Sequence, residues 1–206
     1  ALYEEIIREF TPKAKNGYKF DHTENKPLTV SEAVENNVMK VYYVLDSEQT
    51  KTLTYTVEYY KDNVLQPNDT QTVTKIVQTL EPNTMNVDKT AINIVDKYTG
   101  YKLDTTKTGV IPNTVTSGDT IRVYYVREEY GYSIEYYYGN AKDETKTVTG
   151  TALYGTEIDA FEDKRIDGYR FDHTTNKPLQ VTENAGNNVM KVYYVADDGQ
   201  TKTLEY

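Results

Sequence analysis

The side chains most able to do chemistry in this chain are its two histidines, and both stand in the same Asp-His-Thr segment. His22 follows Asp21, and His173 follows Asp172. An imidazole beside a carboxylate is a pairing that general acid–base catalysis uses. The two segments lie 151 residues apart and match each other, so we expect the histidines in two different modules, not in one site. A side chain that caps a turn is the simpler interpretation of each histidine, and contact with a ligand is the alternative.

Metal binding would need clustered oxygen or sulfur ligands, and the chain has only two short acidic turns to offer. Asp62-Asn63 and Asp197-Asp198 supply such oxygens, but neither turn has the ligand spacing of a calcium loop. The chain has no cysteine, so neither a thiolate site nor a disulfide can form. We therefore expect no metal and no cofactor, with incidental calcium as the alternative.

Two glutamates, Glu58 and Glu135, fall inside predicted strands. Each points opposite to the tyrosine after it, so we expect a charge on the solvent face, paired across strands with lysine. A Lys–Asn isopeptide crosslink is a second interpretation, and it needs a buried lysine beside an asparagine. Lys40 and Lys191 fall on the outer side of their strand by alternation, which argues against that crosslink. Because no nucleophile, base and stabiliser converge, we do not expect an enzyme.

Tyrosine is the unusual residue type, with 21 Tyr against 4 Phe and no Trp. A tyrosine buries a large ring and keeps a hydroxyl that can face water or a ligand. One interpretation is that these rings form the core and the half-buried cover of thin sheets. The other is that some of them stack on sugars. Strand alternation predicts that four rings point outward and are candidates for binding glycan: Tyr42, Tyr60, Tyr137 and Tyr193.

Charge and the length of the apolar stretches argue against two classes of partner. The net charge is −9 and no basic run is present, whereas phosphate binding needs clustered Lys and Arg, so we do not expect nucleic acid. No apolar stretch approaches the length of a membrane span, and no signal peptide is present, so we do not expect membrane insertion.

The positions of these residues are set by an internal repeat. The last 55 residues match the first 55 without a gap, and 34 of the 55 pairs are identical. A divergent copy lies between them, opening at Tyr55 as the last copy opens at Tyr132. Such copies indicate an array of modules. We divide the chain into a first repeat (1–52), which is incomplete and lacks its opening hairpin, a divergent middle repeat (53–128) and a last repeat (129–206). Both ends are expected to continue into a longer array.

Each complete repeat predicts the same order of elements. Tyr55, Val57 and Tyr59 alternate with polar residues in an opening strand, and a turn at 61–63 and a return strand at 72–80 follow. An apolar stripe at helical spacing spans 87–98 and is ended by Gly100, and a weaker stripe spans 154–161. In the closing strand at 189–195, alternation directs one set of residues to one side, namely Met190, Val192 and Tyr194.

This order predicts an α+β fold in which a helix covers one face of a sheet. A β-grasp sheet fits it, with the opening and closing strands side by side at the centre. The first repeat has no opening strand, so its closing strand at 38–44 has an unpaired flank. Exposed strand edges recruit other strands. We expect a neighbouring chain to cover this edge, or the edge to be partly disordered, with 201–206 as a candidate donor.

These residues resemble the MucBP (mucin-binding protein) repeats of Gram-positive surface proteins. The resemblance rests on the Tyr-x-Val-Glu-Tyr-Tyr type of opening at 55–60 and 132–137, on Thr-Val-Thr-Gly at 147–150, on the Gly-Tyr-x-Phe-Asp segment and on the closing Val-Tyr-Tyr-Val strand. It implies ubiquitin-like β-grasp modules in an elongated head-to-tail array, on extracellular adhesins anchored to the cell wall. The middle repeat departs from it with Thr105-Thr106 in place of His-Thr. No family residue for carbohydrate contact carries over.

Two functions remain open at this point. The first is the repeat region of an adhesin that binds host mucin or other glycoprotein glycans through exposed tyrosines. The second is a structural spacer that holds a separate binding domain away from the cell wall. The only partners expected besides glycans are neighbouring repeats of the same array.

Overall fold

The computed structural model describes residues 1–201 and residue 203. With 47% of the residues in strands and 6% in helices, the chain is β-rich. It divides into two compact units: 1–57 with 71–89 and 112–121, and 58–70 with 90–111 and 122–206. This division does not follow the sequence repeat, so the boundaries 1–52, 53–128 and 129–206 stay a prediction.

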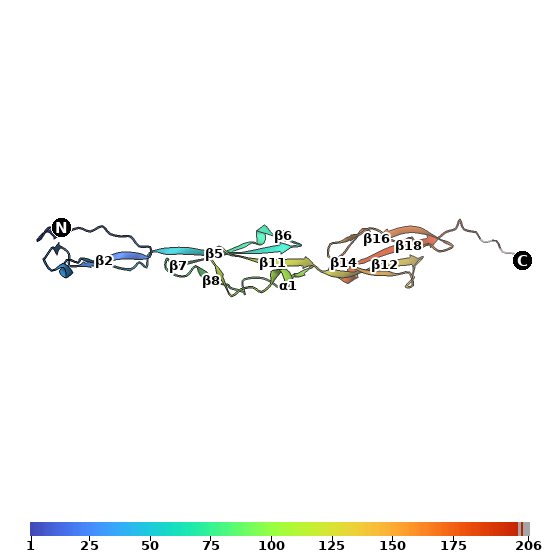
Figure 1. The fold of residues 1–206 in the computed structure, drawn as a ribbon. Helices are drawn as coiled ribbons and strands as arrows, with labels where there is room; N and C mark the ends of the chain where they lie inside the picture. The colour runs from blue at the N-terminus through green and yellow to red at the C-terminus, as the bar shows by residue number, and fades with distance from the viewer. Residues whose placement is uncertain (202, 204–206) are drawn as a thin grey trace. The chain divides into compact units, whose positions relative to one another are not determined.

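In the last repeat, the opening strand β12 and the closing strand β18 are parallel neighbours, with Tyr136 aligned to Val192 (Figure 1). β16 pairs antiparallel with the other edge of β18, and β13 and β14 pair with β12. The predicted adjacency of opening and closing strands is therefore confirmed. The bounds are β12 Glu129–Tyr138, β13 Ala141–Lys142, β14 Val148–Leu153, β15 Glu157–Ile158, β16 Tyr169–Thr175, β17 Leu179–Gln180 and β18 Val189–Ala196.

The middle repeat builds its sheet in the same order, β6-β5-β11-β9, with β7 paired to β5. β5 and β11 are parallel, because Thr56 N donates to Asp119 O at 3.0 Å and Asp62 N donates to Tyr125 O at 2.9 Å. The predicted turn after β5 is confirmed: Asp62 and Asn63 have φ of 46° and 69° and reverse the chain. The bounds are β5 Thr50–Lys61, β6 Val64–Leu65, β7 Gln71–Gln78, β8 Thr84–Asn86, β9 Tyr101–Leu103, α1 Thr105–Thr108, β10 Thr114–Thr116 and β11 Thr120–Arg127.

The first repeat reproduces the second half of this module. β2 pairs with β4 as β16 pairs with β18, and the register shifts at the same place, after Phe20 and after Phe171. β1 pairs with β3 as β15 pairs with β17. Among the described residues β4 pairs with β2 alone, and the candidate donor 201–206 lies largely outside those residues. The bounds are β1 Ile6–Ile7, β2 Tyr18–Glu24, β3 Leu28–Thr29 and β4 Lys40–Leu45. Each of the three repeats also contains a short 3₁₀ helix: Val34–Asn36, Pro67–Asp69 and Ala185–Asn187.

The predicted helices at 87–98 and 154–161 are wrong. The first segment forms turns and bends, and the second contains the short strand β15. Three residues of the stripe at 87–98 are β-branched, namely Val87, Ile94 and Val95, and Asn and Asp stand between the apolar positions; both kinds of residue have low helix propensity. Asp96 has a φ of 48°, which no right-handed helix accommodates. The α-helix found in the described part of the chain is α1, a single turn capped by the side chain of Asp104.

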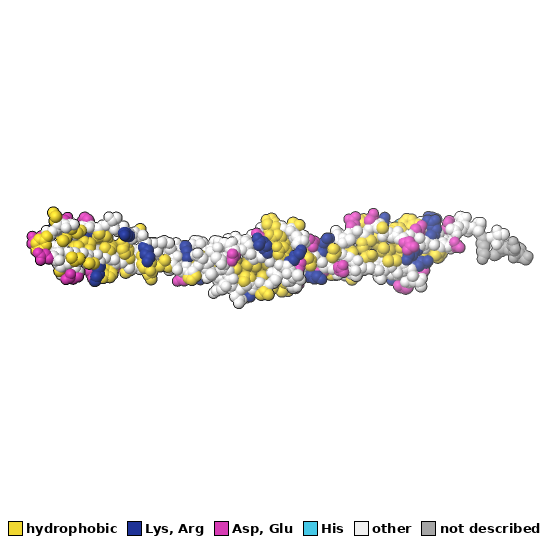
Figure 2. Space-filling model, viewed as in Figure 1, with side chains coloured by type: hydrophobic (Ala, Val, Ile, Leu, Met, Phe, Trp, Pro, Cys, Tyr) yellow, Lys and Arg dark blue, Asp and Glu magenta, His cyan; other side chains and the backbone are white. Residues whose placement is uncertain are grey.

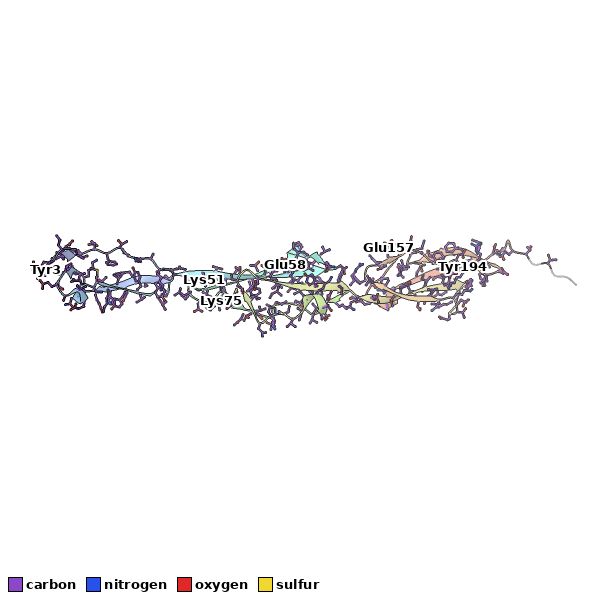
Figure 3. The ribbon with its side chains drawn as sticks, viewed as in Figure 1. Tyr3, Lys51, Glu58, Lys75, Glu157 and Tyr194 are labelled. Atoms are coloured by element: carbon purple, nitrogen blue, oxygen red, sulfur yellow. The ribbon has the colours of Figure 1, made fainter. Side chains whose placement is uncertain are left out.

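Irregular segments cover the inner face of the last sheet in place of a helix, and buried tyrosines hold them. Tyr136 donates its hydroxyl to Glu162 O at 2.9 Å, and Tyr138 donates to Lys164 O. Tyr194, labelled in Figure 3, donates to Asp163 Oδ1 at 2.6 Å and accepts from Lys164 N at 2.8 Å. Covered backbone groups in an irregular segment need partners outside it. Phenylalanine would fill the same space without supplying them, which explains why tyrosine stands at these three positions.

The middle repeat uses the same device, and it makes stability sensitive to alkali. Tyr125 donates to Asn93 O at 2.8 Å, and burial raises the pKa of Tyr125 to about 12. Burial also raises the pKa of Tyr98 and of Tyr194, and each donates a hydrogen bond to an aspartate that adds to the rise.

We therefore expect alkaline unfolding. Tyrosine in an unfolded chain titrates at about pH 10, so above that pH the unfolded chain releases protons that the folded chain keeps. This contribution to stability is complete below pH ~10 and is lost as the pH rises towards 12. Tyrosinate absorbance should rise in a steep step that coincides with the loss of the β-sheet circular dichroism signal. A shallow titration near the ordinary tyrosine pKa, with the sheet signal intact, would contradict this expectation.

The core of the last sheet confirms the predicted alternation. Met190, Val192 and Tyr194 are 0% exposed, while the residues between them lie half-buried on the other face. Leu179 of β17 packs into the same cluster. The other members of the cluster lie on the opening strand: Ile134, Tyr136 and Tyr138.

Three glycines at matching places immediately precede the strands β2, β9 and β16, and all have positive φ: Gly17 at 79°, Gly100 at 75° and Gly168 at 80°. A Cβ on Gly17 would lie 2.5 Å from Leu80, and one on Gly100 would lie 2.1 Å from Tyr154. Nothing lies within 4 Å of the corresponding position on Gly168. At the first two glycines, an apolar side chain that follows the return strand of the next predicted repeat packs against the bare backbone.

Candidate functional site

The outer face of the last sheet carries a row of three stacked rings, one from each of three neighbouring strands. Tyr137 of β12 stacks on Tyr193 of β18 at 5.0 Å between centroids, and Tyr193 stacks on His173 of β16 at 4.6 Å. The spacing of adjacent strands is about 4.8 Å, so rings at aligned positions meet face to face. Since β12 and β16 flank β18 on opposite sides, both faces of Tyr193 are covered.

A charged cluster lies beside this row. Tyr137 donates its hydroxyl to Glu135 at 2.8 Å, and Lys142 forms an ion pair with Glu135 at 2.9 Å. Burial raises the pKa of Glu135, but the hydrogen bonds from Lys142 and Tyr137 outweigh it and leave that pKa below its usual value. The bond to Glu135 raises the pKa of Tyr137. The cluster is therefore an ionised carboxylate held by a cation and a neutral phenol.

The middle sheet repeats the arrangement on its outer face. Tyr60 stacks on Tyr124 at 4.8 Å, and Tyr60 donates to Glu58 at 2.7 Å. Arg122 pairs with Glu58, which is labelled on β5 in Figure 3, at 3.2 Å. The predicted solvent-face charges at Glu58 and Glu135 thus have cross-strand partners, an arginine for the first and a lysine for the second. The hydrogen bond to Glu58 raises the pKa of Tyr60.

The first repeat builds a smaller version without an opening strand. Tyr42 stacks on His22 at 4.6 Å and donates to Glu24 at 2.9 Å, and Lys40 pairs with Glu24 at 3.2 Å. The hydrogen bond from Tyr42 lowers the pKa of Glu24, and the bond from Lys40 adds to that effect. The second face of Tyr42 meets no other ring of the described residues.

The prediction that the histidines lie in turns is wrong. Both lie inside strands, at the register shifts of β2 and β16. His22 Nδ1 lies 2.6 Å from Asp21 Oδ2, and His173 Nδ1 lies 2.6 Å from Asp172 Oδ2. A shift in register adds a residue to one strand and turns its side chain to a new side. It brings each imidazole over a tyrosine ring, a placement that the Asp-His-Thr motif alone does not reveal.

All four tyrosines predicted to point outward lie on these outer faces and are half-buried: Tyr42, Tyr60, Tyr137 and Tyr193. Tyr124 and Arg122 belong to the same set and were missed. Strand alternation could have found Tyr124, since the Val-Tyr-Tyr-Val segment places it as it places Tyr193. Arg122 could have been found as the match of Lys191.

The outer faces offer ring edges, hydroxyls and paired charges more than free ring faces. No group of three or more metal-ligating side chains occurs in the part of the chain that the structure describes. Acidic and basic side chains are intermixed on the face shown in Figure 2. Within the described residues, no helix is both long enough and apolar enough to cross a bilayer.

Comparisons with known proteins give little beyond this geometry. No family model matches the chain, and no curated protein matches it. Five chains of solved structures match. One is the crystal structure of Mub-RV, which is 16% identical, with an alignment that covers 70% of this chain and 99% of that one and a TM-score of 0.26. At that TM-score the likeness supports no conclusion about fold or function.

Proposed function

We propose that this chain is a non-catalytic repeat region of an extracellular adhesin anchored to a bacterial cell wall, and that it binds host mucin or other glycoprotein glycans along its outer faces. Support comes from the same kinds of contact in three sequence-related repeats: a tyrosine hydrogen-bonded to a glutamate, beside a basic side chain and a second ring. In the first repeat Tyr42 and Glu24 make this contact from positions that do not correspond to Tyr137 and Glu135. Hydroxyls, carboxylates and ring edges are groups that hydrogen-bond to sugars.

The proposed architecture is a tandem array of β-grasp modules. Its support is that the opening and closing strands are parallel neighbours in two sheets: β12 beside β18, and β5 beside β11. The module departs from the resemblance in lacking the helix, whose place over the inner face irregular segments take.

Binding of the full chain to mucin-coated plates and to a glycan array tests the proposed function. We expect the double variant Tyr60→Ala, Tyr137→Ala to lose most of the binding, since it removes a ring and a glutamate partner from each complete repeat. Tyr60→Phe, Tyr137→Phe keeps the stacked rings and removes the hydroxyls, so it separates polar contact from stacking. Because Tyr193 has both faces covered, we expect the hydroxyl to contribute more than the ring.

Val95→Ala is the matched control, because Val95 is 67% exposed and lies in the segment that covers the inner side of the middle sheet. That segment is bound there through Asn93 O, which accepts a hydrogen bond from Tyr125. This control should bind as the unchanged chain does. Equal binding by the double tyrosine variant and the control would reject these outer faces as the site.

A spacer that projects a separate binding domain is the second candidate, and a specific feature favours it. In the last repeat β12 and β18 are adjacent and parallel, so the chain enters the sheet at one end and leaves it at the other. Such a module extends an array along its strands. Absence of mucin and glycan binding above background, together with an extended scattering profile, would leave the spacer as the function.

A further inference from the structure

We propose that the parallel pair of opening and closing strands in each complete repeat resists tension, and keeps the repeat folded when the chain is pulled along its length. The chain enters the last sheet through β12 and leaves it through β18, and the two strands are parallel neighbours (Figure 1). A pull on both sides of this repeat therefore draws β12 towards its first residue and β18 towards its last, so the strands must slide past each other. This property goes beyond the proposed function, since it holds whichever ligand the chain binds.

The hydrogen bonds between β12 and β18 share such a load. The two strands are aligned over six residue pairs. Ser133 N donates to Asn188 O at 2.9 Å at one end of this pairing, and Gly139 N donates to Tyr194 O at 2.8 Å at the other. Hydrogen bonds between strands run across the strand direction, with a slant in parallel pairs. Sliding therefore loads all of them at once, whereas peeling the strands apart breaks them one after another.

Both faces of this strand pair are covered, which limits the access of water to bonds that are being stretched. On the inner face Tyr136, Met190 and Val192 are 0% exposed. On the outer face Tyr137 lies opposite Tyr193, and the two rings stack at 5.0 Å between centroids. A stretched hydrogen bond that water does not reach is not replaced by one to solvent, so breaking it is costly. The stacked rings thereby contribute to mechanical resistance.

The middle repeat has the same arrangement. The chain enters its sheet through β5 and leaves through β11, and these strands are neighbours. On the inner face Val57 is 1% exposed and Val123 is 0% exposed. On the outer face Tyr60 stacks on Tyr124 at 4.8 Å between centroids. A parallel pair that is covered on both faces thus joins entry to exit in two repeats of divergent sequence.

Single-molecule pulling on the full chain tests this proposal. The chain has no cysteine, so two introduced cysteines give unique attachment points. The pair Glu129→Cys and Asp198→Cys makes β12 and β18 slide, whereas Asn140→Cys and Asp198→Cys pull the same end of both strands and peel them apart. All three side chains are exposed.

We expect the sliding arrangement to need at least about twofold more force than the peeling arrangement at the same pulling speed, because the bonds then share the load. The chain between the attachment points extends by at most about 3.6 Å per residue, so the length released identifies the unfolding of this sheet. Equal forces in the two arrangements, or a larger force for peeling, would overturn the proposal.

A ring substitution tests the contribution of the outer cover. Tyr137→Ala removes a ring that lies over the β12–β18 pair, so we expect a loss of force in the sliding arrangement. Tyr132→Ala is the matched control, because Tyr132 is a half-buried ring of the same strand that lies opposite Gly150 of β14, outside the parallel pairing. We expect this control to keep the force of the unchanged chain. Equal forces for the two variants would overturn the role assigned to the stacked rings.

Discussion

Replacing Asn188 by alanine is expected to lower the stability of the last repeat by about 4 kcal/mol, a large part of the total stability of a small domain. Asn188 is the buried polar side chain of the described core, at 0% exposed. It donates to Gly131 O and Thr182 O and accepts from Thr182 N at 2.8 Å and Thr182 Oγ1 at 2.9 Å. Alanine leaves several of these groups without a partner, and each costs about 1–3 kcal/mol when buried.

The first repeat supplies a matched control for this prediction. Asn37 bonds only to Ser31 within the described residues, and it is partly exposed, so water can replace what Asn37→Ala removes. We expect that variant to lose about 1 kcal/mol. Native-state hydrogen exchange measures both losses, with amides of β12 and β18 reporting the first and amides of β2 and β4 the second. Equal losses would mean that the bond to Gly131 and the burial of Asn188 contribute little.

The strands were predictable because their signal is local. Alternation along Tyr55, Val57 and Tyr59 reflects a sheet with one buried face, and the closing segment repeats it around Val192. The internal repeat added what a single strand pattern lacks. It marked the opening and closing strands of the two complete repeats, and a β-grasp sheet fitted to that order predicted that the two strands are neighbours.

The helix predictions were wrong because an apolar stripe indicates which residues are buried. It does not indicate where the backbone N–H and C=O groups between them find hydrogen-bond partners. At 87–98 and at 159–165 the backbone groups find partners outside the segment, in hydroxyls such as those of Tyr125 and Tyr136. These partners are distant in sequence: Tyr136 and Glu162 are 26 residues apart. The excess of tyrosine over phenylalanine is a sign of this device, but neither interpretation drawn from the sequence, core and sheet cover or stacking on sugars, included it.

The candidate site was predictable in part, for a similar reason. Parity placed Tyr42, Tyr60, Tyr137 and Tyr193 on outer faces, because direction along a strand is set by the two-residue period. Strand alternation does not predict which side chain lies beside a given residue on the neighbouring strand. The stacking of Tyr193 between Tyr137 and His173 depends on register and on the shift inside β16, which only the structure supplies.

Replacing Gly100 by alanine is expected to destabilise the packing between the middle and last predicted repeats by about 3 kcal/mol. Two costs add. A side chain at a φ of 75° is strained by about 1–2 kcal/mol, and the new Cβ would lie 2.1 Å from Tyr154 Cγ, which forces the ring away. Overpacking of this kind costs about 1–3 kcal/mol. The ring has little room to retreat, because it also contacts Tyr101 and Tyr130 at 6.2 Å and 6.3 Å between centroids.

Two further glycines separate the strain from the contact. Gly168→Ala carries the same strain, at a φ of 80°, with nothing within 4 Å of the new atom, so it should lose only about 1–2 kcal/mol. Gly17→Ala meets Leu80, a flexible side chain that is 49% exposed and free to rotate, so its loss should fall between the other two. Urea denaturation of the three variants measures this order. Three equal losses would show that the backbone conformation alone requires glycine, and that Tyr154 contributes nothing by packing against it.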